Sequence, residues 1–321
     1  MAELKIFSGS ANRPLAEGIC DYLGVSIGGA LVGKFKNGET RIKIDEHVRG
    51  ADVFVIQSTS EPSDHHIMEL LIMIDALKRA SADRITAVMP YYAYAKQEKK
   101  TSGREPITAK LIANLVVTAG ADRVLAVDLH APAIQGFFDI PVDHLSAIPM
   151  LADRLREEED GNVVVVSPDS GGVTRANEFR EHIGAGLAII AKHRPEPDVV
   201  EMLEMVGDVE GRTAVIVDDL ISTGGTLAEA AEVLVARGAR RVLAYAVHPV
   251  LAHDAVAIIR NSCLERVVVT NTIQIPREMR DDRIQIERVD WLIGEAIRRI
   301  HEGSSISALF QAARVRQEML I

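Results

Sequence analysis

Short runs of valine and isoleucine alternate with amphipathic stretches along almost the whole chain. The runs are nearly continuously apolar, as is typical of strands buried in a parallel sheet. The stretches between them suit helices that cover such a sheet, so the alternation predicts an α/β fold. The predicted strands are Leu4–Ser8, Asp52–Ser58, Arg84–Pro90, Arg123–Leu129, Asn162–Ser167, Leu187–Ala191, Thr213–Val217, Arg241–Val247 and Arg266–Asn271. The predicted helices are Asn12–Leu23, Asp64–Ala80, Pro106–Ala119, Ala147–Glu158, Gly172–His182, Thr226–Arg237 and His253–Asn261.

The two halves of the chain repeat this pattern. Residues 52–90 run strand, helix, strand, and residues 213–247 do the same with similar turns. The repeat indicates two domains of one fold, although common helix-to-strand turn chemistry is an alternative source of the likeness. A length of 321 residues also suggests two domains at about 150 residues each. We place the boundary near Asp143–Ile148, with domains at 1–145 and 146–321.

The overall charge limits the partners. Acidic residues number 46 against 36 basic ones, for a net charge of −10, and aromatic residues are only 4%. Both values argue against a nucleic-acid partner, which needs a basic face or stacking platforms. The longest apolar runs are too short to span a bilayer, the N-terminus lacks a signal-peptide pattern, and two cysteines make no disulfide framework. We therefore expect a cytoplasmic protein without a membrane partner.

Residues 215–226, VIVDDLISTGGT, carry the strongest functional pattern. A buried strand delivers Asp218 and Asp219, and a loop with two adjacent glycines then opens a helix. Such a loop turns backbone N–H groups inward, and the helix start adds its dipole, which together can seat one phosphate. Carboxylates would repel that phosphate, so the acid pair suits vicinal sugar hydroxyls or a metal. The pattern predicts a ribose 5-phosphate site, and the alternative is an acidic strand end before an ordinary helix cap.

This segment resembles the phosphoribosyl pyrophosphate motif of type I phosphoribosyltransferases. Other motifs between about residues 6 and 310 are similar to the ribose-phosphate pyrophosphokinase family, among them FKNGE, AGADRVLAVDLH, IQGFFDIPVDHL and VSPDSGGVTRA. The resemblance implies two tandem type I phosphoribosyltransferase-like domains, each a mainly parallel sheet flanked by helices. It also implies that the pyrophosphoryl group of ATP is transferred to the anomeric oxygen of ribose 5-phosphate, which gives 5-phosphoribosyl 1-pyrophosphate and AMP.

The resemblance also assigns roles to residues. For ribose 5-phosphate it implies Arg194, Asp218, Asp219, Ser222, Thr223, Gly224, Gly225 and Thr226. For ATP it implies Phe35, Asn37, Gly38, Glu39, Lys96 and Gln97. For Mg²⁺ it implies His130 and Asp169, and for catalysis Lys192 and Arg194. The ATP residues lie in the first half and the ribose residues in the second, so we expect ATP to bind across a domain or subunit boundary.

The metal residues differ in chemistry. Asp169 follows a predicted strand and precedes a glycine-rich turn, while Asp128 and His130 alternate at another strand end and are expected on one face. One carboxylate with phosphate oxygens is typical of magnesium, but a histidine ligand is less usual. We therefore expect Asp169, more than His130, to be a direct ligand. The alternative for His130 is a hydrogen bond to a phosphate, and for Phe35 a place in the core rather than against adenine.

Lys192 and Arg194 alternate on one face of a predicted strand. Transition states of this kind are stabilised by positioned positive charge, which both side chains carry. They stand at the start of 193–210, where prolines and acids predict an irregular segment, as clustered bases do in 90–106. Residues 193–210 are predicted to be a lid over the site, and the alternative is a solvated surface loop.

Some positions depart from the family pattern. Lys96 stands in place of Arg, and Glu98 stands in place of Asp. Lysine neither stacks on rings nor makes the bidentate hydrogen bonds that arginine makes. The ATP affinity and the choice of nucleotide donor are therefore in question. Ser222 stands in place of Asp, which matters little if backbone N–H groups hold the phosphate. Ala93 replaces a Gly, and Ala191 and His193 flank Lys192 where other residues are frequent.

The family implies regulation and assembly as well. Inorganic phosphate as activator and ADP as inhibitor would act at a subunit interface, to which Arg49, Ser81, Arg104 and Ser304–Ser307 correspond, whereas His47 departs from an expected Ser. The family also implies hexamers built from dimers.

Two other functions remain open at this point. A nucleobase phosphoribosyltransferase would keep 215–226 without needing Lys192, Arg194 or an ATP site. A non-catalytic regulatory homologue would be expected to have lost catalytic residues, all of which are present here.

Overall fold

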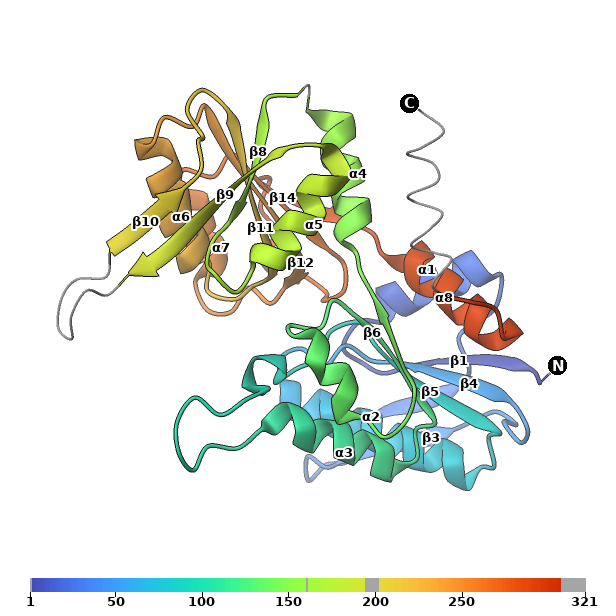
Figure 1. Cartoon of the computed structure of the whole chain (residues 1–321). Coiled ribbons are helices and arrows are strands. Elements are labelled where there is room, and N and C mark those ends of the chain that lie inside the picture. Colours follow the sequence, from blue (N-terminus) through green and yellow to red (C-terminus); the bar gives the residue numbers. More distant parts are fainter. Residues whose placement is uncertain (1, 160, 194–201, 307–321) are drawn as a thin grey trace. The chain divides into compact units, whose positions relative to one another are not determined.

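The computed structural model describes residues 2–159, 161–193 and 202–306, which divide into two units (Figure 1). The first unit holds the described residues up to Ser146, Thr272–Gln274 and the segment from Val289. The second holds Ala147–Asn271 and Ile275–Arg288. Each unit is built on a mainly parallel sheet flanked by helices, so the predicted α/β class is confirmed.

The first unit contains a parallel sheet in the order β1-β4-β5-β6-β7 and a separate hairpin, β2–β3. Its strands are β1 (Leu4–Ser8), β2 (Ala30–Lys34), β3 (Thr40–Ile44), β4 (Asp52–Ile56), β5 (Arg84–Met89), β6 (Arg123–Val127) and β7 (Val142–Leu145). Its α-helices are α1 (Arg13–Leu23), α2 (Ser63–Arg79), α3 (Thr108–Ala119) and α8 (Asp290–Glu302), with 3₁₀ turns η1 (Ala95–Gln97) and η2 (Pro132–Phe137).

The core of the first unit lies where α2 and α3 cover one face of this sheet (Figure 1). All five residues of β4 are buried, as the continuous apolar run predicts for a central parallel strand. Leu70 and Ile74 of α2 and Val116 of α3 are fully buried in the same cluster as Val55 of β4. The helices therefore follow the 3.6-residue period, with one apolar face on the sheet.

The second unit contains a seven-stranded sheet in the order β10-β9-β8-β11-β12-β13-β14. Its strands are β8 (Val163–Ser167), β9 (Gly186–His193), β10 (Met202–Val206), β11 (Thr213–Ile221), β12 (Arg241–Pro249), β13 (Arg266–Thr270) and β14 (Ile284–Glu287). Its α-helices are α4 (Ile148–Glu158), α5 (Val173–Ile183), α6 (Gly225–Ala236) and α7 (Ala255–Asn261), with a 3₁₀ turn η3 (Arg277–Met279).

The second unit is covered on both faces. Leu234 of α6 and Ile259 of α7 are fully buried in one cluster with Ile216 of β11. On the other face, the Phe179 ring of α5 meets the Tyr245 ring of β12 edge to face at 5.6 Å between centroids. In the described part of this unit, every strand pair is parallel except β9 with β10, so the strands other than β10 point their carboxyl ends to one edge.

The two units repeat one strand order, with β1, β4, β5, β6 and β7 corresponding to β8, β11, β12, β13 and β14. The register agrees as well: Leu4 pairs with Asp52 as Val163 pairs with Thr213. Asp52 pairs with Arg84 as Thr213 pairs with Arg241. The prediction of two domains of one fold is therefore supported by the register in which the strands pair, and not only by the order of the strands.

The structure differs from the predicted elements in several places. Residues 193–210 were predicted to be irregular, yet β10 pairs antiparallel with β9 over Met202–Val206. This edge strand carries an exposed Glu204 between apolar residues, so it lacks the continuous apolar run used to recognise strands. The hairpin β2–β3, the strands β7 and β14, and the helix α8 were also not predicted.

Helix α8 belongs to the first unit, whereas the predicted domain 146–321 includes it. The Tyr22 hydroxyl of α1 donates to Glu295 of α8 at 2.9 Å. Gly294 allows this packing, because a Cβ there would lie 2.5 Å from the Tyr22 ring. The two helices lie side by side in Figure 1. Among the described helices, none has both the length and the apolar character needed to cross a bilayer.

Candidate active site

An acidic pair lies at the centre of the second sheet. Asp218 and Asp219 stand on β11 between β8 and β12, with Asp219 almost fully buried and Asp218 partly buried. The backbone N–H of Asp219 donates to Asp218 Oδ1 at 2.8 Å. Arg175 of α5 places Nη1 3.2 Å from Asp218 Oδ1 and 3.5 Å from Asp219 Oδ1. The pair is therefore held together and faced by a cation.

Asp218, one member of the acid pair, has a raised pKa. Burial, together with a hydrogen bond to the adjacent Asp219 and the charge of Asp219, raises the pKa of Asp218 to about 7. Arg175 and the backbone N–H of Asp219 act in the opposite direction and lower this pKa. A carboxyl that titrates near neutral pH among these partners is typical of a functional site.

The loop after β11 forms a backbone cradle. Gly224 has φ +79° and is buried, and α6 begins at the next residue without a side-chain cap. A Cβ at Gly224 would lie 3.3 Å from the Ala255 carbonyl oxygen, so glycine is required for both conformation and space. The first N–H groups of a helix have no partner within the helix and can bind an anion. The side chains of Thr223 and Thr226 are exposed beside this loop.

A second loop reaches the same edge of the sheet. Asp169 follows β8, its Oδ1 accepts from the Gly172 N–H at 2.8 Å, and its side chain is exposed. Strand β8 lies next to β11 and parallel to it. The structure thus brings Asp169, the acid pair and the loop 222–226 to the carboxyl ends of two neighbouring strands, where α/β sheets bind ligands.

The predicted catalytic residues can be placed only in part. The backbone of Lys192 lies in β9 and pairs with Leu203 of β10. Strand β9 is parallel to β8, so Lys192 stands toward the same edge as Asp169. Arg194 and the rest of the predicted lid up to residue 201 lie outside the described residues.

In the first unit, the predicted ATP residues of the hairpin lie at its tip. Phe35 is 49% exposed, so it is not a core residue. Arg41 places its guanidinium 5.4 Å from the ring centroid. Gly38 has φ +92° and donates to the Phe35 carbonyl at 2.9 Å, and the Asn37 side chain accepts from the Glu39 N–H. A tight turn therefore presents an aromatic ring to solvent.

The other ATP residues, Lys96 and Gln97, are exposed in η1. The Gln97 side chain accepts from the Thr108 hydroxyl of α3 at 2.6 Å. Because α3 begins at Thr108, this bond ties η1 to the start of that helix. No described contact of Lys96 or Gln97 indicates a nucleotide, so their role stays a prediction.

The loop after β6 corrects one expectation. Strand β6 ends at Val127, and Asp128 has φ +38°, so Asp128 and His130 do not alternate on a strand as predicted. The Ser146 hydroxyl donates to Asp128, and the Leu129 N–H donates to His144 Nε2 at 2.9 Å. Burial lowers the pKa of His144. His144, which the sequence reading did not single out, thus holds the backbone beside His130.

The predicted regulatory residues occupy loops of the first unit. Arg49 and Ser81 lie on adjacent loops, joined by the Gly50 N–H donating to the Ser81 carbonyl at 2.9 Å. Arg104 lies on another loop, where the neighbouring Glu105 accepts from Thr101 and Ser102. These bonds lower the pKa of Glu105 to about 2. Of Ser304–Ser307, the last residue lies outside the described part of the chain.

The fit of a magnesium ion can be tested on these residues. Within the described ranges, no three His, Cys, Asp or Glu side chains come together in a way that could hold a metal. Asp169 nevertheless offers an exposed carboxylate beside a predicted phosphate site. Magnesium often binds one or two carboxylates and takes its other ligands from water and substrate phosphates. The residues present therefore fit a magnesium ion that arrives with a phosphorylated substrate.

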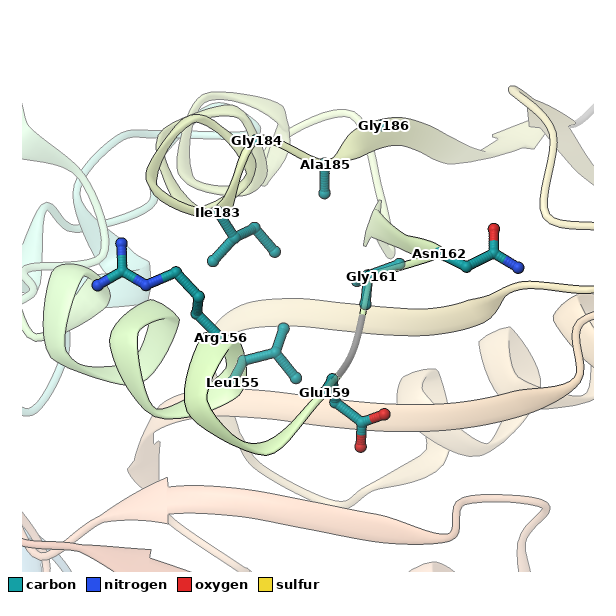
Figure 2. A pocket seen from close by; sticks show the side chains of 10 residues that line it. Leu155, Arg156, Glu159, Gly161, Asn162, Ile183, Gly184, Ala185 and Gly186 are labelled. Atoms are coloured by element: carbon teal, nitrogen blue, oxygen red, sulfur yellow. The ribbon is translucent and has the colours of Figure 1, made fainter. Parts of the chain in front are cut away.

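A pocket elsewhere in the second unit does not belong to this site. Figure 2 shows it between the ends of α4 and α5, with Leu155, Glu159, Asn162 and Ile183 among its lining residues. It lies at the amino ends of β8 and β9, opposite the edge that carries Asp169. Ligands in open α/β sheets bind at carboxyl ends, so this pocket carries no argument for the chemistry.

Comparison with known proteins gives a consistent picture. A sequence profile for the N-terminal domain of ribose phosphate pyrophosphokinase matches residues 4–120, and one for the phosphoribosyl synthetase-associated domain matches residues 192–311. The ribose-phosphate pyrophosphokinase of Bacillus subtilis (strain 168) is 52% identical over 307 residues, covering 96% of this chain and 97% of the relative. That of Corynebacterium ammoniagenes is 52% identical over 309 residues, covering 96% and 98%.

Among solved structures, the phosphoribosylpyrophosphate synthetase from Mycobacterium smegmatis matches with a TM-score of 0.90 and 43% identity. The match covers 94% of this chain and 100% of that structure. The similarity therefore extends over both units.

Proposed function

This chain belongs to the ribose-phosphate pyrophosphokinase family, and from that premise we propose that it transfers the pyrophosphoryl group of ATP to the anomeric oxygen of ribose 5-phosphate. The products are 5-phosphoribosyl 1-pyrophosphate and AMP. The observation that carries the proposal is the arrangement on β11, in which a partly buried acid pair precedes a backbone cradle. Relatives that are 52% identical, with 98% of their own length covered, support it. Neither alternative, a nucleobase phosphoribosyltransferase or a regulatory homologue, is favoured by these relatives.

The second unit supplies the ribose 5-phosphate side. In this proposal, Asp218 and Asp219 accept hydrogen bonds from the vicinal hydroxyls of the sugar. The backbone N–H groups of Ser222, Thr223, Gly224, Gly225 and Thr226 hold the 5-phosphate, with help from the two threonine hydroxyls. Because the hydroxyls and the phosphate bind at separate positions, the carboxylates stay away from the like charge of the phosphate.

Lys192 and Arg194 act on the transferred group. The anomeric oxygen attacks the β-phosphorus of ATP while AMP leaves, so negative charge on the phosphoryl oxygens has to be stabilised during transfer. A lysine ammonium and an arginine guanidinium provide that charge, and Arg194 also contacts ribose 5-phosphate. The position of Lys192 on β9, toward the edge that carries Asp169, supports this role.

Magnesium and ATP complete the site. Asp169 would hold Mg²⁺ together with substrate phosphates, and His130 would either join it or donate to a phosphate. The ion would neutralise phosphate charge and orient the triphosphate. Phe35 would stack on the adenine, with Asn37, Gly38, Glu39, Lys96 and Gln97 around the nucleotide. The exposed ring at the hairpin tip supports stacking over a core role.

Regulation and assembly follow the family. Inorganic phosphate and ADP would act at a site that includes Arg49, Ser81 and Arg104, in a cytoplasmic hexamer. The bond between the Gly50 and Ser81 loops supports a shared role for the first two residues.

The proposal is tested by release of AMP from ATP and ribose 5-phosphate with Mg²⁺, with and without phosphate and ADP, on size-fractionated protein. We expect AMP and 5-phosphoribosyl 1-pyrophosphate in equal amounts. Asp219→Asn should raise KM for ribose 5-phosphate about 10- to 100-fold, because a charged acceptor is lost. Asp153→Asn is the matched control, since Asp153 lies on α4 and pairs with Arg156 of the same helix at 2.7 Å. Absence of AMP from every fraction would reject the proposal.

A further inference from the structure

Arg175 is the cation that faces the acid pair, and no role was assigned to it from the sequence. It stands in the first turn of α5, and its side chain is only 17% exposed. One guanidinium nitrogen, Nη1, lies within 3.5 Å of a carboxylate oxygen of both Asp218 and Asp219. The contact joins residues that are 43 positions apart, and the adjacency of β8 and β11 brings them together.

The first unit provides an internal comparison for this contact. By register, Gln57 and Ser58 take the places of Asp218 and Asp219 after the corresponding strand. The matching turn of α1 carries Leu15 and Ala16, which are apolar and fully buried. The acid pair and the arginine are therefore present together in one unit and absent together in the other. A residue needed only to pack the helix against the sheet would not follow the acid pair in this way.

We propose that Arg175 is a positioning residue of the ribose 5-phosphate site, which holds the carboxyl groups of Asp218 and Asp219 together and orients them as joint acceptors for vicinal hydroxyls. The inference rests on the proposed function and adds to it the group on which recognition of the sugar depends. Two adjacent carboxylates repel each other, and burial makes that repulsion stronger. A cation bridging both oxygens offsets the repulsion and sets the direction in which their remaining lone pairs point.

The charges around the pair support this role. Asp219 on the same strand raises the pKa of Asp218, and Arg175 on α5 lowers it. In the loop after β8, Asp169 Oδ1 accepts from the Gly172 N–H at 2.8 Å. A Cβ at Gly172 would lie 3.8 Å from Arg175 Nη1, so Asp169 is a nearby acid as well. From β12, His248 stands in register with Leu220, next to the pair. Loss of Arg175 is therefore expected to raise the pKa of Asp218 further.

The test compares Arg175→Met with Arg175→Lys and with Arg180→Met. Arg180 lies on the same helix and bonds to Asn177 at 2.8 Å, so its variant makes the same charge change away from the pair. Binding of ribose 5-phosphate and of 2-deoxyribose 5-phosphate is measured by calorimetry from pH 6 to pH 9. The deoxy sugar lacks one of the two vicinal hydroxyls, so the ratio of the two affinities reports the acid pair directly.

We expect wild-type protein to bind ribose 5-phosphate more tightly than 2-deoxyribose 5-phosphate. In Arg175→Met, the ratio of the two affinities should fall about tenfold at pH 7, because a charged contact is lost. The acidic limb of the binding curve, in which affinity falls as the pH is lowered, should move to higher pH in Arg175→Met. A raised pKa of Asp218 means that a more alkaline solution is needed to ionise its carboxyl group. Arg175→Lys should restore part of the preference, and Arg180→Met should match wild type. The circular dichroism spectra should agree.

Three results would overturn the inference: an Arg175→Met preference equal to that of Arg180→Met, an equal loss for both sugars, or an unchanged acidic limb. If Arg175→Met does not fold, the shift of the acidic limb in Arg175→Lys decides in its place. Failure of the proposed function is seen separately, as wild-type protein that binds ribose 5-phosphate but releases no AMP. Calorimetry needs no turnover, so the two failures are distinguishable.

Discussion

Substitution of Gly224 by alanine tests whether the cradle before α6 has the conformation described here. Gly224 has φ +79°, in which a side chain costs about 1–2 kcal/mol. The new Cβ would also lie 3.3 Å from the Ala255 carbonyl oxygen and 3.5 Å from Ile259, which is tighter than an ordinary contact. Alanine makes the unfolded chain less flexible, which returns about 0.4–1 kcal/mol. We therefore expect a net loss of about 1 kcal/mol, or more if the loop cannot move.

The neighbouring glycine is the matched control. Gly225 has an ordinary φ, and its Cβ would meet only the Thr223 hydroxyl, at 3.8 Å. Gly225→Ala gains the same effect on the unfolded chain without the strain, so the two variants should differ by about 1–2 kcal/mol. At about 2–4 °C per kcal/mol for a domain of this size, Gly224→Ala should melt about 2–8 °C below Gly225→Ala.

The assay is thermal unfolding by circular dichroism, with binding of ribose 5-phosphate as a second measurement. Gly224→Ala should also bind the sugar phosphate more weakly than wild type, because a shifted backbone misdirects the N–H groups. Equal melting temperatures for the two variants would refute the left-handed conformation and, with it, the geometry of the cradle.

Three further outcomes follow from the structure. Lys192→Ala should lower turnover by orders of magnitude while ribose 5-phosphate still binds, and near-normal turnover would remove its catalytic role. Burial lowers the pKa of His144 below its ordinary 6.5, so the unfolded chain takes up a proton first as pH falls. The melting temperature should therefore drop below pH 6.5, and His144→Gln should reduce that slope in scans from pH 8 to pH 5. Arg84→Met should cost about 2–3 kcal/mol in urea unfolding, because it removes both of its hydrogen bonds to the buried Asp52 carboxylate; a loss under half a kilocalorie would contradict a structural role for this pair.

The sequence predicted the elements that a local pattern encodes. The continuous apolar runs identified the central strands, and for β1 the predicted bounds equal the observed ones. The glycine pair at 224–225 predicted the start of α6 to within a residue. It failed where the local pattern was weak: β10 is an edge strand with an exposed Glu204, and the turn at Asp128 depends on a left-handed residue that no sequence signal marks.

The sequence by itself determined the α/β class, the repeat of strand and helix, and the acid pair followed by a cradle, because each is set within a few residues by side-chain period or turn chemistry. Only the tertiary structure decided that Arg175 faces Asp218, that α8 packs on α1, and that His144 accepts from Leu129. Those contacts join distant parts of the chain, and they exist because crossover connections place particular strands and helices next to each other. The local sequence pattern therefore predicted the ribose 5-phosphate site, and the order of strands in the sheet determined that the charged side chain of Arg175 lies beside it.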